Sequence, residues 1–382
     1  MRKFGCLLLV VVLLLGVLPP GAWAAELDVA GKSALLMDAA TGTVLYEKNA
    51  HEQLPPASVT KVMTLLLIME AIDSGKIGWN DTVTASEAAA AKGGSQVYLK
   101  VGETMTVTDM VKSIAVSSAN DCACAMAEHI AGSETAFVSN MNRRAKELGM
   151  NDTNFVNCTG LDDEPEAKAH LTSAYDIAIM SRELLTKHQD IKKFTTIWMD
   201  TIRDGSFGLS NTNKLVRFYQ GCTGLKTGFT SSAGHCLSAS AMRDGMELIA
   251  VVLGAENSQA RFAACKQMLD YGFANFALVT PELPTDTVVP VKLGAEKTVT
   301  AVAVQLPGCL IDKAQRSDVT TTVTLEPEVT APVSQGQRLG TLQVKVGERV
   351  LTQIPLVAAR AVPRLTWQQI FTKILKRITM AA

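Results

Sequence analysis

The sequence is poor in the features that mark nucleic-acid-binding proteins. Only 19% of its 382 residues are charged and 5% are aromatic, and 36 basic residues face 37 acidic ones, which gives a formal net charge of −1. A chain so close to neutrality has no overall field that would attract DNA or RNA. Electrostatic recognition by this protein must therefore be local. The hydrophobic share of 47% allows a large buried core and favours two domains.

Histidine and cysteine are too few and too poorly spaced for a metal centre. The run Cys122-Ala123-Cys124 is tighter than zinc sites, which place about two to four residues between ligands. We therefore expect no metal and no cofactor. Seven of the eight cysteines follow residue 24, and an odd count cannot pair fully. Most should be small buried apolar residues, and one disulfide, such as Cys222 to Cys236, stays open.

The sequence also lacks the Gly-x-Ser-x-Gly turn that presents the nucleophile of many serine hydrolases. Without it, His129, His188 and His235 do not indicate a Ser-His-Asp triad. We interpret these three histidines as structural or surface residues.

The first 24 residues have the pattern of a secretory signal. Two basic residues precede an apolar run from Cys6 to Leu18, and a Pro-Pro pair then leads to the triplet Ala22-Trp23-Ala24. This order predicts export with cleavage after Ala24. The apolar run is shorter than the roughly 20 residues of a spanning helix, so an uncleaved membrane anchor is the less favoured alternative. We exclude residues 1–24 from the fold.

Residues 25–280 have the order of elements expected for one α+β domain. A hairpin pattern at 33–46 comes first, helical patterns follow, and three strand patterns close the segment. The expected helices are 62–72, 108–130, 134–148 and 173–187, and the expected later strands are 224–230, 234–242 and 247–254. Strands at both ends of such a domain predict one sheet assembled from both, with the helices packed on it.

The composition changes near the segment Pro281-Glu282-Leu283-Pro284. Residues 281–360 then contain short β-branched runs separated by glycine, proline or charged turns. The runs are 287–291, 298–305, 318–325, 337–346 and 349–355. They predict a small all-β domain, a sandwich, without a catalytic constellation of its own.

Residues 363–382 predict a C-terminal amphipathic helix. Its apolar face consists of Trp367, Ile370, Phe371, Ile374, Leu375 and Ile378, whereas Lys373, Lys376 and Arg377 lie off that face. An aromatic and aliphatic face beside basic residues favours a helix that lies in the headgroup region of a membrane. A helix packed on the β domain and a dimer contact are the alternatives.

The chemistry-bearing pattern begins at Ser58, which stands three residues before Lys61. On a helix this spacing brings the amine close enough to accept the hydroxyl proton. The pair alone is common, and Ser58 also fits a simple helix cap. However, the apolar run 62–69 follows Lys61 and predicts that the amine is buried. Burial, together with a second cation nearby, would lower its pKa from about 10.4 toward neutrality and make it a usable base.

Two further motifs follow in a recognisable order. Ser118-Ala119-Asn120 and Lys226-Thr227-Gly228 come after Ser58 with the order and spacing of the penicillin-binding and serine β-lactamase superfamily, which the chain resembles. Within it, the chain is most similar to the low-molecular-mass D-alanyl-D-alanine carboxypeptidases of serine peptidase family S11. The resemblance covers roughly residues 26–280, and its matching stretches are 56–64, 93–95, 118–121, 224–228 and 233–234. It implies a helical cluster packed on an antiparallel sheet.

The resemblance implies a role for each motif residue, and side-chain chemistry supports these roles. Ser58 would attack the carbonyl of the penultimate D-alanine and form an acyl-enzyme, with Lys61 as general base. Ser118 would relay a proton toward the leaving amine, and Asn120 would hydrogen-bond the substrate amide and Lys61. Taken singly, Ser118 also fits a helix cap and Asn120 a turn residue.

The third motif would recognise the end of the substrate. Lys226 and Thr227 would offer a cation and a hydroxyl to its terminal carboxylate, and Gly228 would let the strand approach closely. The oxyanion hole of the family uses backbone N–H groups, which here belong to Ser58 and Phe229. Without the other motifs, Lys226 would be interpreted as a solvent-facing lysine on an edge strand.

Arg261 aligns with an arginine that completes carboxylate recognition in relatives, although a surface salt bridge would also explain it. Two positions depart from the family pattern. Phe229 stands where close relatives often carry histidine, and residues 170–173 read His-Leu-Thr-Ser. These departures bear on substrate preference and turnover rather than on the class of reaction.

The expected function is removal of the terminal D-alanine from peptidoglycan stem peptides, with β-lactam antibiotics as covalent inhibitors. A serine β-lactamase is one alternative, but no Glu-x-x-x-Asn segment follows the second motif, and residues 154–162 resemble the carboxypeptidases. A catalytically silent wall-binding scaffold is the other, and the intact motifs count against it. The expected location is the outer face of the cytoplasmic membrane, held there by the C-terminal helix.

Overall fold

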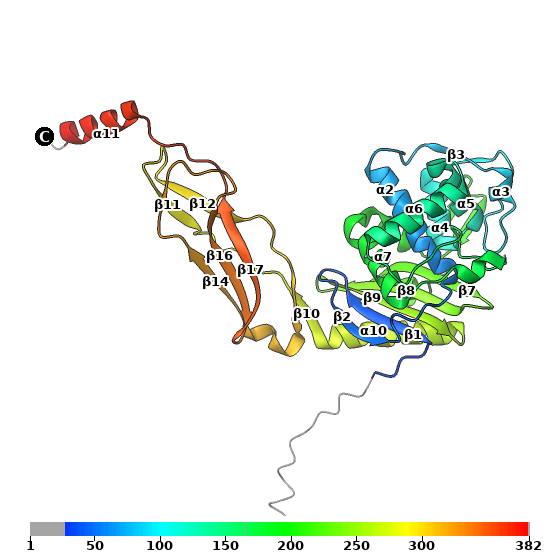
Figure 1. The fold of residues 1–382 in the computed structure, drawn as a ribbon. Helices are drawn as coiled ribbons and strands as arrows, with labels where there is room; N and C mark the ends of the chain where they lie inside the picture. Colours follow the sequence, from blue (N-terminus) through cyan, green and yellow to red (C-terminus); the bar gives the residue numbers. More distant parts are fainter. Residues whose placement is uncertain (1–26, 164, 381–382) are drawn as a thin grey trace, which may run out of the picture.

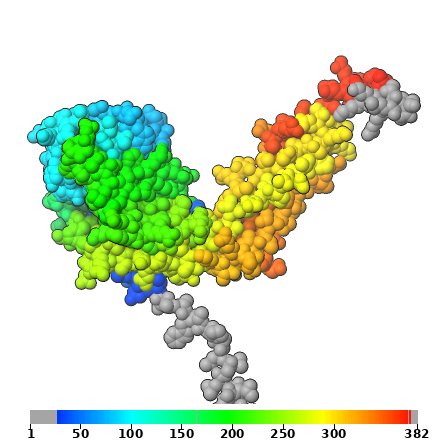
Figure 2. All heavy atoms as spheres, turned by 180° about the vertical axis from the view of Figure 1, so that it is seen from behind, coloured from blue at the N-terminus to red at the C-terminus, as the bar shows by residue number. Residues whose placement is uncertain are grey.

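The structure is a computed structural model that describes residues 27–163 and 165–380. The expected signal and its cleavage after Ala24 lie outside these residues. Figure 1 shows a globular lobe with helices above a sheet, joined to an elongated β lobe. In the opposite view, Figure 2, the two lobes meet at one narrow junction. The expected α+β domain followed by a β domain is confirmed.

A five-stranded antiparallel sheet forms the floor of the first lobe. Its order is β2-β1-β9-β8-β7, so strands from both ends of the domain lie side by side, as the sequence predicted. The strands are β1 (Ser33–Asp38), β2 (Val44–Lys48), β7 (Cys222–Thr230), β8 (Gly234–Arg243) and β9 (Met246–Ala255). β7, which carries the third motif, lies at the edge of the sheet.

The sheet is buried on both faces. Alternate residues of β1 enter different cores: Leu35 and Met37 pack beneath the main helical cluster, while Ala34 and Leu36 pack against the single helix below. Because side chains alternate across a strand, this pattern places the sheet between two layers. The near-continuous apolar runs of β1 and β9 follow from burial on both sides.

Helices cover both faces of the sheet (Figure 1). Those above it are α2 (Lys61–Asp73), α4 (Val107–Ser117), α5 (Asn120–Ala131), α6 (Glu134–Glu147) and α7 (Ala174–Lys187), and α10 (Ser258–Asn275) lies below. Shorter elements of this lobe are η1 (Ala57–Thr60), β3 (Thr82–Thr84), α3 (Glu87–Ala90), β4 (Thr104–Thr106), η2 (Pro165–Ala169), η3 (Gln189–Ile191), α8 (Lys192–Thr195), β5 (Met199–Ile202), β6 (Phe207–Ser210) and α9 (Leu215–Phe218). The sequence analysis did not predict α10.

The helical pattern at 108–130 is two helices rather than one. Ser118 has a left-handed backbone, with φ of 63°, which ends α4, and Ala119 then turns the chain into α5. Apolar spacing continues through this break because both helices face the same core. The second motif therefore sits at a helix junction.

The second lobe is built from the β-branched runs. Its strands are β11 (Val288–Lys292), β12 (Thr298–Ala303), β14 (Val319–Leu325), β15 (Val329–Thr330), β16 (Arg338–Val346) and β17 (Arg349–Ala358), paired in the order β14-β16-β17-β12-β11-β15. They enclose a separate core that includes Val289, Leu339, Leu342 and Leu356. Each of the five predicted runs overlaps one of these strands.

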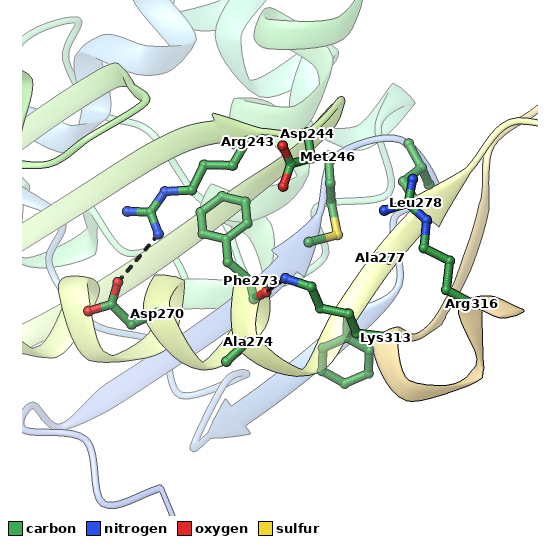
Figure 3. Close-up of a pocket in the computed structure, with 11 residues that line it drawn as sticks. Arg243, Asp244, Met246, Asp270, Phe273, Ala274, Ala277, Leu278, Lys313 and Arg316 are labelled. Carbon is green, nitrogen blue, oxygen red and sulfur yellow. Dashed lines mark hydrogen bonds and ion pairs between the residues drawn. The ribbon is translucent and has the colours of Figure 1, made fainter.

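A small ladder joins the two lobes. β10 (Phe276–Val279) continues directly from α10 and pairs with β13 (Cys309–Asp312), and η4 (Lys313–Asp318) follows β13. Beside this ladder lies a cavity of about 260 Å³ (Figure 3). Lys313 reaches across it and donates to the carbonyl of Phe273 at 2.9 Å. The junction is therefore a hydrogen-bonded connection rather than a free linker.

Helix α11 (Trp367–Met380) ends the described chain at the tip of the β lobe, far from the globular lobe (Figure 1). Trp367 is 75% exposed and Phe371 57%, and Ile374 and Leu375 are also exposed. These four apolar side chains of α11 are therefore largely exposed to solvent. Among the described residues, no helix is both long and apolar enough to cross a membrane.

All seven cysteines within the described part of the chain are free thiols. Cys236 is buried and Cys222 half-buried. Cys222 donates to the carbonyl of Gly224 at 3.6 Å, and Cys236 to that of Ala233 at 3.7 Å. The disulfide between Cys222 and Cys236 that the sequence left open is therefore not formed.

Candidate active site

Ser58 lies on η1, a short 3₁₀ helix that we call the nucleophile turn. It continues directly into α2. Prolines precede it, and Ala57 has a positive φ of 50°, which is unusual for a residue with a side chain. Ser58 is half-buried, and its Oγ lies 2.9 Å from Nζ of Lys61. The predicted contact between hydroxyl and amine is present in the structure.

Burial governs the protonation of Lys61. The residue is fully buried, and this burial lowers its pKa to about 7, although the nearby Cys158 and Asp121 act in the opposite direction. Removing an ammonium from water favours its neutral form. The sequence predicted this shift and its main cause. A second cation does not contribute to it.

A loop from residue 154 to 162 completes the surroundings of Lys61. The carbonyl of Thr159 accepts a hydrogen bond from Lys61 Nζ at 2.8 Å. The next residue, Gly160, has φ of +82° and lies so close to the nucleophile turn that an added Cβ would come within 1.9 Å of the Ala57 carbonyl oxygen. Only glycine fits there. The loop and the nucleophile turn therefore pack against each other with no room for a side chain at position 160.

His170 supports the nucleophile turn from behind, a role that the sequence analysis missed. Its Nδ1 accepts from the backbone N–H of Val156 at 3.1 Å, so its Nε2 carries the proton and donates to Thr60 Oγ1 at 2.8 Å. Thr60 in turn donates to the carbonyl of Ala57 at 2.8 Å. Burial, together with the charge of Lys61, lowers the pKa of His170 to about 4 and keeps the ring neutral.

The second motif lies at the junction of α4 and α5, on the upper side of the site. Ser118 and Asn120 are both buried. The amide nitrogen of Asn120 donates to the carbonyl of Gly93 at 2.7 Å, which leaves Oδ1 without a partner among the described residues. The expected hydrogen bond between Asn120 and Lys61 is therefore not present in this structure. A buried amide oxygen without a partner is a ready acceptor for a ligand N–H.

The third motif faces the nucleophile from the edge strand β7. Lys226 is fully buried, and burial, reinforced by the charges of Lys61 and Arg261, lowers its pKa well below the ordinary value. An added Cβ at Gly228 would lie 2.7 Å from the Pro56 carbonyl oxygen and 3.1 Å from the backbone nitrogen of Ser58. The strand thus reaches the nucleophile turn only because residue 228 is glycine.

Thr227 connects this strand to the second motif. Its Oγ1 donates to Thr212 Oγ1 at 2.7 Å, and the backbone N–H of Thr212 donates to the carbonyl of Val116 at the end of α4. The chain between β6 and α9 therefore ties β7 to the helix that ends at Ser118. Thr212 was not singled out from the sequence.

Phe229 and Arg261 lie on either side of the end of β7. The Phe229 ring is 57% exposed and stacks on His235, with the ring centroids 4.4 Å apart. Arg261 is buried on α10, and its Nη1 donates to the carbonyl of Gly228 at 2.8 Å. It makes no ion pair with a carboxylate of the described residues, so a surface salt bridge does not account for it.

The three motifs bring a serine hydroxyl, a buried amine and a second buried basic side chain to one region of the globular lobe. Ser58 contacts Lys61 directly, Lys226 is close enough to Lys61 for the charge of Lys61 to lower its pKa, and Gly228 brings β7 against the backbone of Ser58. Neither Lys226 nor Arg261 pairs with a carboxylate in the described ranges. A hydroxyl in contact with a buried amine is the arrangement expected of an activated serine.

Two family models match the chain in sequence. Residues 21–257 match the model described as D-alanyl-D-alanine carboxypeptidase, and residues 283–364 match the model described as penicillin-binding protein 5, C-terminal domain. The first model covers the globular lobe with every motif residue except Arg261, and the second covers the β lobe. These matches and the fold place the chain in the class of two-domain penicillin-binding proteins.

Similar proteins of known name agree with this class. The D-alanyl-D-alanine carboxypeptidase DacF of Bacillus subtilis is 45% identical over 344 residues, which are 88% of this chain and 87% of that protein. Penicillin-binding protein 5 from Haemophilus influenzae has a solved structure that superposes with a TM-score of 0.73 at 29% identity, over 91% of this chain and all of the other. The chain belongs to the D-alanyl-D-alanine carboxypeptidase family, and it is a peptidase of that family.

Another solved structure matches about two thirds of the chain. Penicillin-binding protein D2 of Listeria monocytogenes, solved in its ampicillin-bound form, superposes with a TM-score of 0.59 at 31% identity. It matches over 65% of this chain and 99% of its own length.

Proposed function

We propose that the protein is a serine-type carboxypeptidase that removes the terminal D-alanine from stem peptides through an acyl-enzyme on Ser58. The observation that supports this most is the contact of 2.9 Å between Ser58 Oγ and a fully buried Lys61 whose pKa is lowered to about 7. A neutral amine at hydrogen-bond distance is a base poised for the working pH of most enzymes.

The reaction would start with transfer of the Ser58 proton to Lys61 while Oγ attacks the carbonyl of the penultimate D-alanine. Negative charge then develops on the carbonyl oxygen, which the backbone N–H groups of Ser58 and Phe229 would stabilise. Ser118 would pass a proton to the departing amine of D-alanine. Water would then hydrolyse the ester on Ser58 and restore the enzyme.

Recognition of a free carboxylate would distinguish this enzyme from one that cuts inside a peptide. Lys226 and Arg261 are buried cations with no carboxylate partner among the described residues, and Thr227 supplies a hydroxyl beside them. An incoming carboxylate would compensate the repulsion among these cations and gain charge-assisted hydrogen bonds. Asn120 Oδ1, which has no hydrogen-bond partner within residues 27–163 and 165–380, would accept the substrate amide N–H.

The proposed setting is the outer face of the cytoplasmic membrane. The signal pattern of residues 1–24 supports export, and the exposed apolar side chains of α11 support attachment through the C-terminal helix. β-Lactam antibiotics, whose carboxylate and strained amide resemble the end of the peptide, would acylate Ser58.

The test is to incubate the chain without residues 1–24 with a fluorescent penicillin and, separately, with a peptide that ends in D-Ala-D-Ala. We expect a long-lived adduct on Ser58 and release of free D-alanine. Both should disappear in Ser58→Ala and persist in Ser206→Ala, which changes a serine on the exposed turn between β5 and β6.

Two outcomes would overturn the proposal. Rapid hydrolysis of the penicillin without D-alanine release would identify a β-lactamase. Absence of both adduct and product in a folded protein would identify a silent scaffold.

A further inference from the structure

Two cysteines that the proposed chemistry does not use lie together behind Lys61. Cys124 comes from the middle of α5 and Cys158 from the loop that holds the base, and both are fully buried. Both thiols lie within hydrogen-bond distance of the side chain of Glu134. Elements far apart in sequence thus bring two thiols to the same carboxylate.

One carboxylate serves both thiols. Cys158 Sγ lies 3.2 Å from Glu134 Oε1, and Cys124 Sγ lies 3.7 Å from Oε2 of the same residue. The backbone N–H of Cys158 donates to the same Oε1 at 3.1 Å. Cys124 also lies 3.9 Å from Oε1 of Glu128, the more distant of its two carboxylate partners. Glu134 is therefore the common proton acceptor of the pair.

Lys92 keeps this carboxylate charged. Its ammonium lies 2.6 Å from Glu134 Oε2. Burial would raise the pKa of Glu134, but the hydrogen bonds and charge of Lys92 and the contacts of Cys158 outweigh it and hold the pKa below its ordinary value. For Cys158, the hydrogen bond to Cys124, burial and the charge of Glu134 raise the pKa well above the usual range. Cys158 therefore rests in the protonated thiol form.

A cavity opens next to this cluster. It has a volume of about 570 Å³ and is lined by Lys92, Glu134, Asn157 and Thr159, among others. Glu134 lines the cavity on one side and contacts both sulfur atoms on the other. A small reagent that enters the cavity would therefore reach the ion pair that covers the thiols.

We propose that Cys124 and Cys158 are an oxidisable dithiol that closes to a disulfide and thereby ties the loop behind Lys61 to α5. The oxidant would be a low-molecular-mass disulfide. The proposed export of the protein is needed only to explain where this oxidant comes from. The geometry of the thiols is independent of it.

The reaction balances with Glu134 as the proton carrier. Cys158 sulfur attacks one sulfur of the oxidant while its proton passes to Glu134, and the departing thiolate takes that proton to become a thiol. Cys124 sulfur then attacks Cys158 sulfur in the mixed disulfide, and its proton reaches the second leaving thiolate by the same route. The two cysteines lose two electrons and two protons, and the oxidant gains both.

Formation of the disulfide would affect the active site through the backbone. Cys158 precedes Thr159, whose carbonyl contacts Lys61, and the carbonyl of Cys158 accepts from Thr64 Oγ1 on α2 at 2.6 Å. A covalent link between α5 and residue 158 limits how far this loop can move in a partly unfolded state. The disulfide should therefore protect the acylation site against heat.

The experiment compares purified protein treated with oxidised glutathione and with dithiothreitol. After unfolding and labelling with a maleimide, the reduced mature chain should carry seven labels and the oxidised chain five, since two of its seven cysteines are paired. Peptide mapping should recover Cys124 linked to Cys158. Oxidation should also raise Tm by about 5–10 °C, the shift expected for a cross-link that closes a loop of this size.

Variants provide the control. Cys124→Ala should keep all six remaining thiols reactive after oxidation and should lose the rise in Tm, whereas Cys265→Ala should still lose two labels. Cys265 is equally buried but lies on α10, on the other side of the sheet. Peptide mapping of the unaltered chain keeps the test valid if Cys124→Ala fails to fold.

Seven labels after oxidation, or a cross-link between other cysteines, would overturn the inference. The label count does not depend on acylation of Ser58 or on export. A failure here is therefore distinguishable from a failure of the proposed carboxypeptidase function.

Discussion

Lys61 shows how a single buried residue sets the chemistry of the site. Its amine contacts the Ser58 hydroxyl and the Thr159 carbonyl and has no access to solvent. The free-energy cost of burying an ammonium is what brings its pKa down to about 7. A surface lysine at the same spacing would stay protonated at neutral pH and could not accept the serine proton.

The first prediction concerns the pH dependence of acylation. Lys61 must be neutral to take the Ser58 proton, so the rate should fall as pH drops through about 7. We expect the rate of penicillin acylation at pH 6 to be about one tenth of its plateau above pH 8. Stopped-flow acylation across this range measures it. A flat profile between pH 6 and 8 would show that Lys61 is not the titrating base.

The second prediction concerns Arg261, which braces β7 through the Gly228 carbonyl. Arg261→Met keeps the bulk but removes this hydrogen bond and the positive charge. We expect kcat/KM for a peptide ending in D-Ala-D-Ala to fall by about 10- to 100-fold, which corresponds to the loss of one charged hydrogen bond. Arg261→Lys should recover part of the loss, since it restores the charge.

Arg243→Met is the matched control for this prediction. Arg243 lies at the far end of the sheet, where it pairs with Asp270 at 3.7 Å (Figure 3). Its loss should leave kcat/KM unchanged. An equal loss of activity in both variants would mean that Arg261 acts only through general stability.

At the residue scale, the sequence identified the side chains that carry the three motifs and missed those that hold them in place. Ser58 and Lys61 are recognisable because their spacing has a chemical meaning. His170 hydrogen-bonds to Thr60, which lies 110 positions earlier in the sequence, and Thr212 accepts from Thr227, which lies 15 positions later. No local pattern encodes such long-range contacts.

At the scale of elements, the nucleophile turn and the loop 154–162 behave as one unit. Gly160 fits against the Ala57 carbonyl, Thr159 contacts Lys61, and Asp162 accepts a hydrogen bond from Ser232 on the turn between β7 and β8. The loop therefore touches both the base and the strand that carries the third motif. We therefore expect the proposed catalysis to depend on the position of this loop, although the loop supplies no motif residue.

The third prediction tests this coupling with a matched pair of glycines. Gly160 and Gly149 both have positive φ, +82° and +77°, but only Gly160 has a neighbour that an added Cβ would strike. Gly149→Ala should cost about 1 kcal/mol through backbone strain alone. Gly160→Ala should cost about 3 kcal/mol or more and should abolish penicillin acylation.

Thermal unfolding and acylation rates measure both variants. If Gly160→Ala and Gly149→Ala lose similar stability, the loop can move enough to make room for a side chain at position 160. A Gly160→Ala protein that is still acylated at the normal rate would contradict the coupling of loop and turn.

The sequence predicted most elements because their apolar patterns are strong, and it failed where a pattern spans a break or has no clear period. The segment 108–130 read as one helix because Ser118 interrupts the backbone without interrupting the apolar face. Helix α10 was not predicted because polar and apolar residues are distributed around it with little asymmetry. One of its buried residues is the charged Arg261. In both cases tertiary contacts, rather than local propensity, decide the structure.

At the scale of the whole molecule, the β lobe separates the catalytic site from the C-terminal helix. Figure 1 places α11 at the tip of the β lobe, with the globular lobe at the other end. The exposed Trp367 and Phe371 are thus available to a surface that the active site does not touch. Attachment and catalysis should be independent of each other.

The fourth prediction follows from this separation. Deleting residues 363–382 should abolish sedimentation with vesicles that contain anionic lipid and leave D-alanine release from a soluble peptide unchanged within about twofold. The full chain with Phe371→Glu should bind the vesicles more weakly. Continued tight binding by the shortened chain would exclude α11 as the anchor.

The narrow junction between the lobes has an evolutionary consequence. The core of the β lobe shares no residue with the two cores of the globular lobe, and the contact between them is limited to the β10–β13 ladder and its neighbours. Recombination near residue 281 would break few contacts. The solved chain of the Listeria protein matches 65% of this chain over 99% of its own length. Evolution could therefore replace the β lobe and retain the globular lobe.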